Sequence, residues 1–423
     1  MEQPSELGEL YYYYEEEEEA SGANWSSLPG HPEPCAWEVE AAETDWEVSF
    51  ALLPALYLLV FVLGLAGNGL VLLTVWRGPA GKRRSADTYL GHLALADLAF
   101  VVTLPLWAAY TALRFHWPFG TALCKLSSYL VLLNMFASAF CLGCLSFERY
   151  LAIVHALPHS AGRGGVGAGS SSSRPRLGTL LSLVGVWLMA GLLALPALLL
   201  RDTRVSRRHY DDRHYDDFGG NTSVGTVVVV ECDMDFSALA SSPEEEVYWL
   251  AGLSLATTAL GFAAPLLLMT LCYCSIGAAV RRHFRPRAPR QRDEGRQRRR
   301  LLRILVALVA VFAGCWLPFH LLKSLYVLAW VGILELPCPG RALILRLHPY
   351  ATCLAYLNSC LNPFLYAFFD GRFRAQCRRL LGLRQARRRG GSGSGAGQAA
   401  GSISSTLSGQ TQKSEAPSLG TKV

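Results

Sequence analysis

Seven long apolar runs constrain the fold of this chain more than any other feature. A helix needs about 20 mostly apolar residues to cross the hydrocarbon core of a bilayer, and only helices or closed barrels satisfy their backbone polar groups in lipid. The runs are longer than barrel strands and do not alternate with period two, so they indicate helices. The sequence therefore predicts an all-α membrane protein, a seven-transmembrane helix bundle. The predicted spans are residues 49–76, 86–112, 124–152, 177–200, 247–280, 301–330 and 341–369.

Proline occurs inside six of these seven spans. A proline in the interior of a water-soluble helix costs about 3 kcal/mol, whereas neighbouring helices and ordered waters re-satisfy the freed carbonyl in a membrane bundle. We therefore expect kinked helices that surround a cavity and move, not plain anchors. The prolines are Pro54, Pro105, Pro196, Pro265, Pro318 and Pro363.

The distribution of charge predicts the orientation in the membrane. Residues 1–50 contain fourteen Asp or Glu and no Lys or Arg, whereas residues 281–303 hold eleven arginines and residues 372–389 hold eight. Basic segments mark the cytoplasmic side, so we expect a multi-pass plasma-membrane protein with an extracellular N-terminus and a cytoplasmic C-terminus. The net charge of +6 belongs to the cytoplasmic face and does not predict a nucleic-acid partner.

Composition divides the chain into four parts. We expect an acidic extracellular tail over 1–48, the bundle over 49–370, a short amphipathic juxtamembrane helix over 371–383 and a disordered cytoplasmic tail over 384–423. Glycosylation motifs at Asn24 and Asn221 fall on the predicted outer side. Serines and a threonine over 404–408 are candidate phosphorylation sites, and Cys377 is either acylated or unmodified.

Four of the twelve cysteines fall on the predicted outer side. An even number of cysteines in an oxidising compartment predicts disulfides. We favour Cys124–Cys232, which would join the start of the third span to the long loop over 201–246, and the remainder pairs Cys35 with Cys338. The other cysteines lie in spans or on the inner side and are expected to be free.

Asp97 lies inside an apolar run from Leu90 to Tyr110. A carboxylate near the middle of a bilayer costs roughly 2.5–3.5 kcal/mol, so it is rarely found there without a task. Asp97 is either a tolerated polar residue that faces the interior of the bundle, or an intramembrane site with partners on other helices.

Three further motifs predict switching elements. Glu148 and Arg149 form an adjacent acid–base pair at the end of the third span, where the carboxylate can hold the guanidinium in one conformation and release it in another. Pro318 follows Trp316 in the sixth span and predicts a hinge beside a large aromatic lever. In the seventh span, polar residues lie close to Pro363, and we expect them to hydrogen-bond to the carbonyls that this proline frees.

Taken together, the ordered motifs resemble those of a rhodopsin-like (class A) G-protein-coupled receptor. The motifs are Gly67-Asn68, Leu93 to Asp97, Glu148-Arg149-Tyr150, Trp187, Pro265, Cys315 to Pro318 and Asn362 to Tyr366, one or more in each span. The resemblance implies an activation switch made of Glu148, Arg149, Tyr150, Trp316, Pro318, Asn362, Pro363 and Tyr366. It also implies that no cofactor is required and that an allosteric sodium ion is held by Asp97, Asn134, Ser138, Asn358 and Ser359.

Other stretches resemble the members of this family that bind small, strongly basic, apelin-like peptides. These stretches are residues 82–87, 100–107, 117–121, 124–130 and 356–370. The resemblance implies a ligand site made of Glu43, Asp45, Trp107, Tyr110, Arg201, Lys323, Tyr326 and Tyr356, with Arg201 and Lys323 receiving the carboxylate of the peptide's C-terminus. This chain departs from those relatives at Phe319, where they have tyrosine, and at Arg114 and His116, where they have acidic residues.

The resemblance also implies partners on the inner side: a heterotrimeric G protein, of the inhibitory class, and arrestin with receptor kinases, besides the surrounding lipid bilayer. A receptor for another peptide, of the angiotensin or bradykinin type, is the alternative. A transporter is less favoured because the chain shows no internal repeat. An enzyme is not expected, because the sequence contains no metal motif such as His-Glu-x-x-His and no nucleophile with a base at useful spacing.

Overall fold

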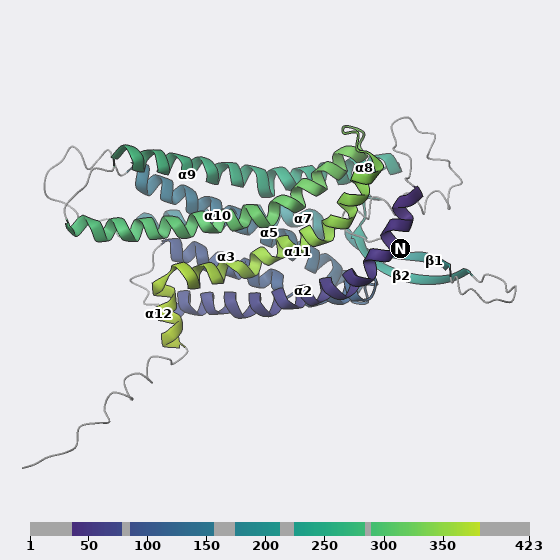
Figure 1. The fold of residues 1–423 in the computed structure, drawn as a ribbon, viewed down its shortest axis with the longest axis horizontal. Coiled ribbons are helices and arrows are strands. Elements are labelled where there is room, and N and C mark those ends of the chain that lie inside the picture. The colour runs from purple at the N-terminus through teal and green to yellow at the C-terminus, as the bar shows by residue number, and fades with distance from the viewer. Residues whose placement is uncertain (1–35, 78–84, 156–173, 212–223, 284–288, 381–423) are drawn as a thin grey trace, which may run out of the picture. The chain divides into compact units, whose positions relative to one another are not determined.

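The computed structural model describes residues 36–77, 85–155, 174–211, 224–283 and 289–380, and within these ranges the side chains of 36–47, 207–227 and 282–301 are among those not described. Long helices run side by side through this part of the chain (Figure 1). In chain order the bundle consists of α2 (Ala36–Arg77), α3 (Ser85–Val101) with α4 (Leu104–Ala112), α5 (Gly120–Tyr150), α7 (Arg174–Leu200), α8 (Pro243–Thr258) with α9 (Ala264–His283), α10 (Pro289–Trp330) and α11 (Cys338–Phe369). The seven-helix bundle predicted from the apolar runs is therefore confirmed.

Helix α5 is the central element of the bundle. It packs against α3, α7 and α9, and most of its residues between Asn134 and Ser146 are buried. In its most apolar stretch 67% of the residues are buried, against 28% for α7, so α7 lies at the periphery, where lipid would cover it. On the other side of the bundle, α11 packs between α10 and α2.

Six helices of the described chain are long and apolar enough to cross a membrane. Helix α11 is long enough as well, with 32 residues, but its apolar character is diluted by polar side chains. Asn358, Ser359 and Asn362 are almost completely buried, so these polar groups face the inside of the bundle and not lipid.

Two of the six span prolines, Pro105 and Pro265, lie next to interruptions of the α-helix, whereas the other four lie inside continuous helices. The predicted second span is interrupted between Val101 and Leu104, just before Pro105, and the Thr103 hydroxyl donates to the Phe100 carbonyl at 2.8 Å. A π-helical segment, η4 (Ala259–Ala263), precedes Pro265, and a second one, η3 (Leu151–His155), extends α5. Helix α11 contains a proline that was not considered, Pro349, in addition to Pro363.

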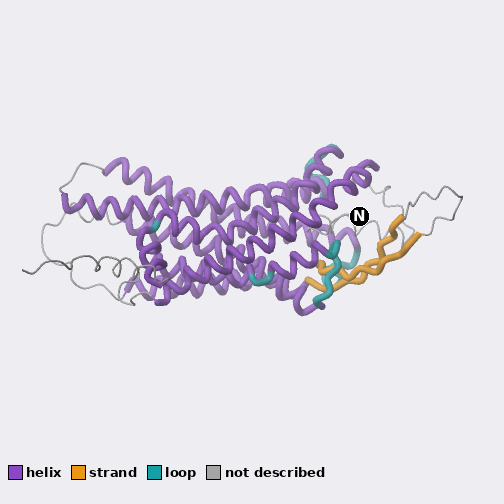
Figure 2. The backbone as a smooth tube through the Cα atoms, turned by 60° about the horizontal axis from the view of Figure 1, so that its bottom comes forward, coloured by secondary structure: helices purple, strands orange, loops and turns teal. Residues whose placement is uncertain are grey.

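A β-hairpin at one end of the bundle was not predicted. Strands β1 (Arg201–Asp211) and β2 (Val224–Met234) pair antiparallel from Arg201 opposite Met234 to Asp211 opposite Val224 (Figure 2). The run from Val227 to Val230 favours a strand, because β-branched side chains suit a pleated backbone. The fold is thus a helix bundle with one added hairpin, and we call this end of the bundle the hairpin end.

One boundary differs from the prediction. Helix α2 begins at Ala36, within the segment assigned to the acidic tail, because residues 36–47 are rich in Ala and Glu, which favour helix, and contain no Gly or Pro. The juxtamembrane helix α12 (Gly371–Leu380) is present, with Phe373 buried against Tyr366, and residues 381–383 of the predicted helix lie outside the described residues. Arg374 donates to the carbonyls of Ala367 and Phe368, which the end of α11 leaves without helical partners.

Candidate ligand-binding site and polar core

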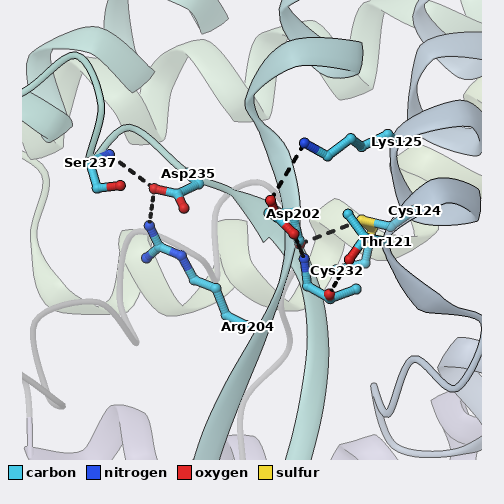
Figure 3. Close-up of polar contacts among 9 residues, drawn as sticks. Thr121, Cys124, Lys125, Asp202, Arg204, Cys232, Asp235 and Ser237 are labelled. Atoms are coloured by element: carbon cyan, nitrogen blue, oxygen red, sulfur yellow. Dashed lines mark hydrogen bonds and ion pairs between the residues drawn. A yellow bond between two sulfur atoms is a disulfide. The ribbon is translucent and has the colours of Figure 1, made fainter.

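Three contacts, which we call the clamp, fix the base of the hairpin to helix α5: a disulfide, an ion pair and a hydrogen bond. The predicted disulfide Cys124–Cys232 is confirmed and joins the start of α5 to β2, with Cα atoms 5.6 Å apart. Beside it, the Lys125 ammonium lies 3.4 Å from the Asp202 carboxylate, and the Thr121 and Thr203 hydroxyls are hydrogen-bonded at 2.6 Å (Figure 3).

The other side of the hairpin base is tied to the segment that follows β2. The Arg204 guanidinium donates to the Asp235 carboxylate at 2.8 Å, and the Ser237 backbone N–H donates to the same oxygen at 2.9 Å (Figure 3). Partial burial raises the pKa of Asp235, but the hydrogen bonds from Ser237 and the charge of Arg204 outweigh it and lower the pKa to about 2. The backbone N–H of Thr203, with a smaller effect of Lys125, lowers the pKa of Asp202.

Behind this clamp, the described residues enclose a cavity of about 150 Å³. The hairpin contributes Arg201, Cys232 and Met234 to its wall, and the rest comes from α2, α4, α5, α7, α8, α10, α11 and the turn between α4 and α5. Seven aromatic residues line it: Tyr57, Trp107, Tyr110, Phe115, Trp316, Phe319 and Tyr356. Arg201 and Lys323 supply positive charge, and the described lining includes no Asp or Glu.

Five of the eight predicted ligand residues meet in this cavity: Trp107, Tyr110, Arg201, Lys323 and Tyr356. Both cations are largely buried, and Arg201 also donates to the Cys232 carbonyl at 2.7 Å, which directs its guanidinium inward from the hairpin. Tyr326 does not line the cavity, because it packs with Val327 and Ile344 and stacks on Trp330. The side chains of Glu43 and Asp45 lie outside the described residues.

Several lining residues were missed in the sequence. His348 on α11 is 1% exposed and lies beside Phe319, with ring centroids 5.2 Å apart. Ser254 and Thr257 on α8 add hydroxyl groups to the wall. An ionisable residue in an apolar span is itself a candidate functional residue, and this criterion, which we applied to Asp97, would also have identified His348.

The turn between α4 and α5 docks onto the hairpin. Arg114 and Phe115 have positive φ of 54° and 65°, a strained conformation for residues other than glycine. The Arg114 guanidinium lies 5.1 Å from the ring centroid of Phe50 in α2, and the backbone N–H of Trp117 donates to the Val230 carbonyl at 2.7 Å. The Val230 N–H in turn donates to His116 at 3.2 Å. His116 therefore takes part in this docking, whereas Arg114 contacts α2, and neither residue lines the cavity.

The floor of the cavity is an aromatic cluster on α10. Trp316 lines the cavity and packs edge-on against Phe319 at 5.9 Å between centroids. His320 stacks on Phe262 of η4 at 4.8 Å and is hydrogen-bonded to the Thr258 hydroxyl at 3.0 Å. The candidate lever Trp316 thus lines the cavity and is linked to the π-helical segment before Pro265 through His320, whose ring lies 5.7 Å from it.

Deeper in the bundle, Asp97 is fully buried within a polar network that we call the polar seam. Its two carboxylate oxygens accept hydrogen bonds from the amides of Asn134 at 2.9 Å and Asn362 at 3.1 Å. The Ser359 hydroxyl donates to the Asn134 carbonyl oxygen at 3.1 Å, and Asn134 also donates to Ser138 at 3.3 Å. Of the two readings of Asp97, the structure supports the one with partners on other helices.

The polar seam also fits a hard cation. Sodium prefers oxygen ligands, and the seam gathers the Asp97 carboxylate, two serine hydroxyls and the amide oxygen of Asn134. The amide oxygen of Asn358 is buried next to them and accepts no hydrogen bond from the described residues. Hydrogen bonds bring together four of the five residues predicted for sodium, and Asn358, the buried neighbour of Ser359 in the chain, offers an amide oxygen that could act as a further ligand.

The carbonyl freed by Pro363 accepts a hydrogen bond from another helix, and not from the seventh span as the sequence predicted. Pro363 has no N–H, so the carbonyl of Ser359, four residues earlier, has no helical partner. Asn68 of α2, which is fully buried, donates to this carbonyl at 2.7 Å and to that of Gly64 at 3.0 Å. Gly67 allows the two helices to approach, because a Cβ there would lie 2.9 Å from the Pro363 ring.

At the opposite end of the bundle, Arg149 and Glu148 form the predicted pair, with 3.7 Å between nitrogen and oxygen. Next to them, Ser146 donates to the Tyr273 hydroxyl at 3.0 Å, which links α5 to α9. Tyr150 stacks on Phe147, and Tyr366 is buried above Phe373. The predicted switch residues thus lie at three levels: Trp316 and Pro318 near the cavity, Asn362 and Pro363 at the polar seam, and the others at the far end.

Three predicted modifications involve residues outside the described part. Cys338 is disulfide-bonded, and Cys35, its predicted partner, lies outside the described residues. Asn24 and Asn221 lie outside them as well, as do the candidate phosphorylation sites over 404–408.

Comparison with known proteins agrees with this geometry. The family model described as "7 transmembrane receptor (rhodopsin family)" matches residues 67–366. The chain is 55% identical to the apelin receptor of Xenopus tropicalis over 381 residues, which is 90% of this chain and 92% of that protein. It is 50% identical to apelin receptor A of Danio rerio over the full length of both. It is 33% identical to type-1 angiotensin II receptor A of Xenopus laevis over 332 residues, 78% of this chain and 80% of the other.

Proposed function

The chain belongs to the rhodopsin family of seven-transmembrane receptors, and from this premise we propose that it is a cell-surface receptor for apelin-type basic peptides that signals through heterotrimeric G proteins. The observation that carries the proposal is the cavity. It combines an aromatic wall with two buried cations, Arg201 and Lys323, and has Trp316 at its floor. The family is one of receptors, which are not enzymes.

The peptide would bind with its C-terminal end in the cavity. Arg201 and Lys323 offer charge-assisted hydrogen bonds to a carboxylate, and the aromatic residues Trp107, Tyr110 and Tyr356 pack around an apolar side chain. The basic part of the peptide would remain near the acidic N-terminal segment, with Glu43 and Asp45 as contacts. A segment with fourteen acidic residues and no basic ones steers a cationic ligand toward the site.

Activation would follow as a shift between two bundle arrangements. A peptide in the cavity touches Trp316, which lies two residues before the hinge at Pro318, so repacking of this ring moves the far end of α10. At that end the pair between Glu148 and Arg149 is partly exposed and weakly held, at 3.7 Å. Its opening would free Arg149 for the tail of a G protein α-subunit.

A sodium ion in the polar seam would hold the inactive arrangement. Asp97, Asn134, Ser138, Asn358 and Ser359 would hold it, and the bound charge neutralises the buried carboxylate. These residues come from α3, α5 and α11, so their separation on activation would weaken ion binding. By linkage, a bound agonist would then lower the affinity for sodium, and bound sodium would lower the affinity for the agonist by the same factor.

The remaining partners and the orientation follow from charge. The N-terminus would be extracellular and the C-terminus cytoplasmic, with arginine-rich segments against an anionic membrane surface. We place the G protein, of the inhibitory class, at the end that carries Arg149 and α12. Receptor kinases would phosphorylate the tail over 404–408, and the added charge would recruit arrestin.

A G-protein activation assay in cells that express the chain tests the proposal. An apelin peptide should activate the receptor, and the variant Lys323→Gln should weaken the peptide with a free carboxylate more than its C-terminal amide. Arg114→Gln serves as the control, because this side chain lies outside the cavity lining. Activation by angiotensin II and not by apelin would favour the alternative peptide class.

A further inference from the structure

Ser128 of α5 carries a hydroxyl that the bundle leaves without a partner. The residue is 5% exposed and lines the cavity, and its hydroxyl makes no hydrogen bond with the described residues. A serine inside a helix either faces water or donates to a carbonyl of the preceding turn, as the neighbouring Ser127 does to Cys124 at 3.3 Å. In the part of the chain that the structure describes, Ser128 is the only serine or threonine whose hydroxyl is buried without such a partner.

Helical spacing directs the Ser128 side chain toward the cavity. The residues of α5 that line the cavity follow the i, i+3, i+4, i+7 pattern of a single helix face, and they are Ser128, Val131, Leu132 and Met135. Since the other three are apolar, Ser128 supplies the one polar side chain of α5 on this wall. It follows Cys124 by one helical turn, so it lies one turn further into the bundle than the disulfide that anchors the hairpin (Figure 3).

Two other neutral donors in the cavity wall also lack a partner. The indole nitrogens of Trp107 on α4 and Trp316 on α10 are buried and make no hydrogen bond with the described residues. An indole N–H can only donate, and a serine hydroxyl has one hydrogen to donate. The two cations of the wall, Arg201 and Lys323, are donors as well and accept nothing. A ligand that satisfies the neutral donors must therefore carry hydrogen-bond acceptors.

A peptide supplies such acceptors along its backbone. Each residue has one carbonyl, a neutral acceptor, whereas the single terminal carboxylate is attracted to the cations of the wall. A buried donor without a partner is costly, so a carbonyl placed against it adds affinity and fixes the position of the ligand. A ligand without a carbonyl at that place would leave the Ser128 hydroxyl unsatisfied.

We propose that Ser128 is a further specificity-determining residue: its hydroxyl donates a hydrogen bond to a backbone carbonyl in the C-terminal part of the bound peptide. This inference rests on the proposed function, and it adds a neutral contact to the two cations assigned to the carboxylate there. The contact reads the backbone of the ligand and not its charge.

Competition binding of an apelin peptide to the full-length receptor on membranes tests the contact. Ser128→Ala should weaken binding about three- to tenfold, the loss of one neutral hydrogen bond. The matched control is Ser127→Ala, which should change affinity by less than about twofold, because this hydroxyl bonds to a carbonyl within α5.

Thermal unfolding of the peptide-free receptor separates a ligand contact from a structural role. Ser128→Ala should leave Tm at or above the wild-type value, because alanine removes a buried hydroxyl that has no partner and favours helix. A residue that holds the bundle together would instead lower Tm when it is replaced.

A series of modified peptides identifies the acceptor. In each peptide one backbone amide is replaced by a thioamide, whose sulfur accepts hydrogen bonds less strongly than oxygen. At one position the thioamide should weaken binding to the wild-type receptor, yet bind Ser128→Ala as well as the unmodified peptide does. The loss caused by Ser128→Ala should also be equal for peptides that end in a carboxylate and in an amide, because a backbone carbonyl does not depend on the terminal charge.

Four results would overturn the inference while leaving the proposed function intact. They are unchanged affinity in Ser128→Ala, a lower Tm of this variant without peptide, additive losses at every thioamide position, and a loss confined to the carboxylate peptide, which would assign the hydroxyl to the carboxylate. Failure of the unmodified peptide to bind the wild-type receptor would instead refute the proposed function, and the inference with it.

Discussion

Replacing Asn68 with alanine should destabilise the bundle, because it removes the donor that satisfies a carbonyl left open by proline. The Asn68 amide donates to the Ser359 carbonyl at 2.7 Å, across the contact between α2 and α11. Without it, this buried carbonyl has no helical N–H, since residue 363 is proline. An unsatisfied buried group costs about 1–3 kcal/mol, while measured hydrogen bonds between membrane helices average about 0.6 and reach about 1.7 kcal/mol.

We therefore expect Asn68→Ala to cost about 1–2 kcal/mol, which corresponds to a fall in Tm of about 1–3 °C for a chain of this size. Thermal unfolding of the purified receptor can be followed with a thiol-reactive dye, because Cys315 and Cys360 are free and buried. The matched control is Thr74→Val on the same helix. The Thr74 hydroxyl donates to the Val71 carbonyl inside α2, so its loss leaves the contact between helices unchanged.

The decisive comparison uses a second background. Pro363→Ala restores an N–H that can bond to the Ser359 carbonyl, so Asn68→Ala should cost less in this background by about 1 kcal/mol. Equal losses of stability in the two backgrounds would refute the reasoning, because they would show that Asn68 does not act through the carbonyl that Pro363 frees.

Three further predictions concern other sites. Gly67→Ala should lower Tm, because its Cβ would meet the Pro363 ring at 2.9 Å, whereas Gly69→Ala, with open space around it, should not. Asp97→Asn should remove the sodium dependence of agonist affinity in competition binding, and an unchanged sodium response would contradict the proposed ion site. The pKa of Asp235 is lowered to about 2, so its ion pair with Arg204 stabilises the hairpin above the unfolded pKa and is lost only as the pH falls toward 2. The contribution of this pair to hairpin stability, measured by hydrogen exchange, should therefore be constant between pH 5 and 8, and an Asp235→Asn variant should lose protection by the same amount throughout that range.

The amino-acid sequence by itself determined the class of fold and much of the polar core. Apolar length sets the number of helices, because lipid leaves the backbone no other way to satisfy its polar groups. A carboxylate at position 97 had to face the interior of the bundle, with partners on other helices as one of two alternatives, and Asn134 and Asn362 are those partners. These outcomes depend on the chemistry of single residues in lipid, so they can be predicted from the sequence without knowing which residues contact one another.

Tertiary structure alone decided which residues meet. The sequence showed that Pro363 frees a carbonyl, but the donor is Asn68, 291 residues away from Ser359 and on another helix. Tyr326 and Lys323 are neighbours on α10, yet only Lys323 faces the cavity, while Tyr326 packs toward Val327 and Ile344. The rotation of each helix about its axis sets these contacts, and it depends on how neighbouring helices pack. The hairpin was missed for the same reason, because its strands are held by Cys124, Lys125 and Trp117 from a distant part of the chain.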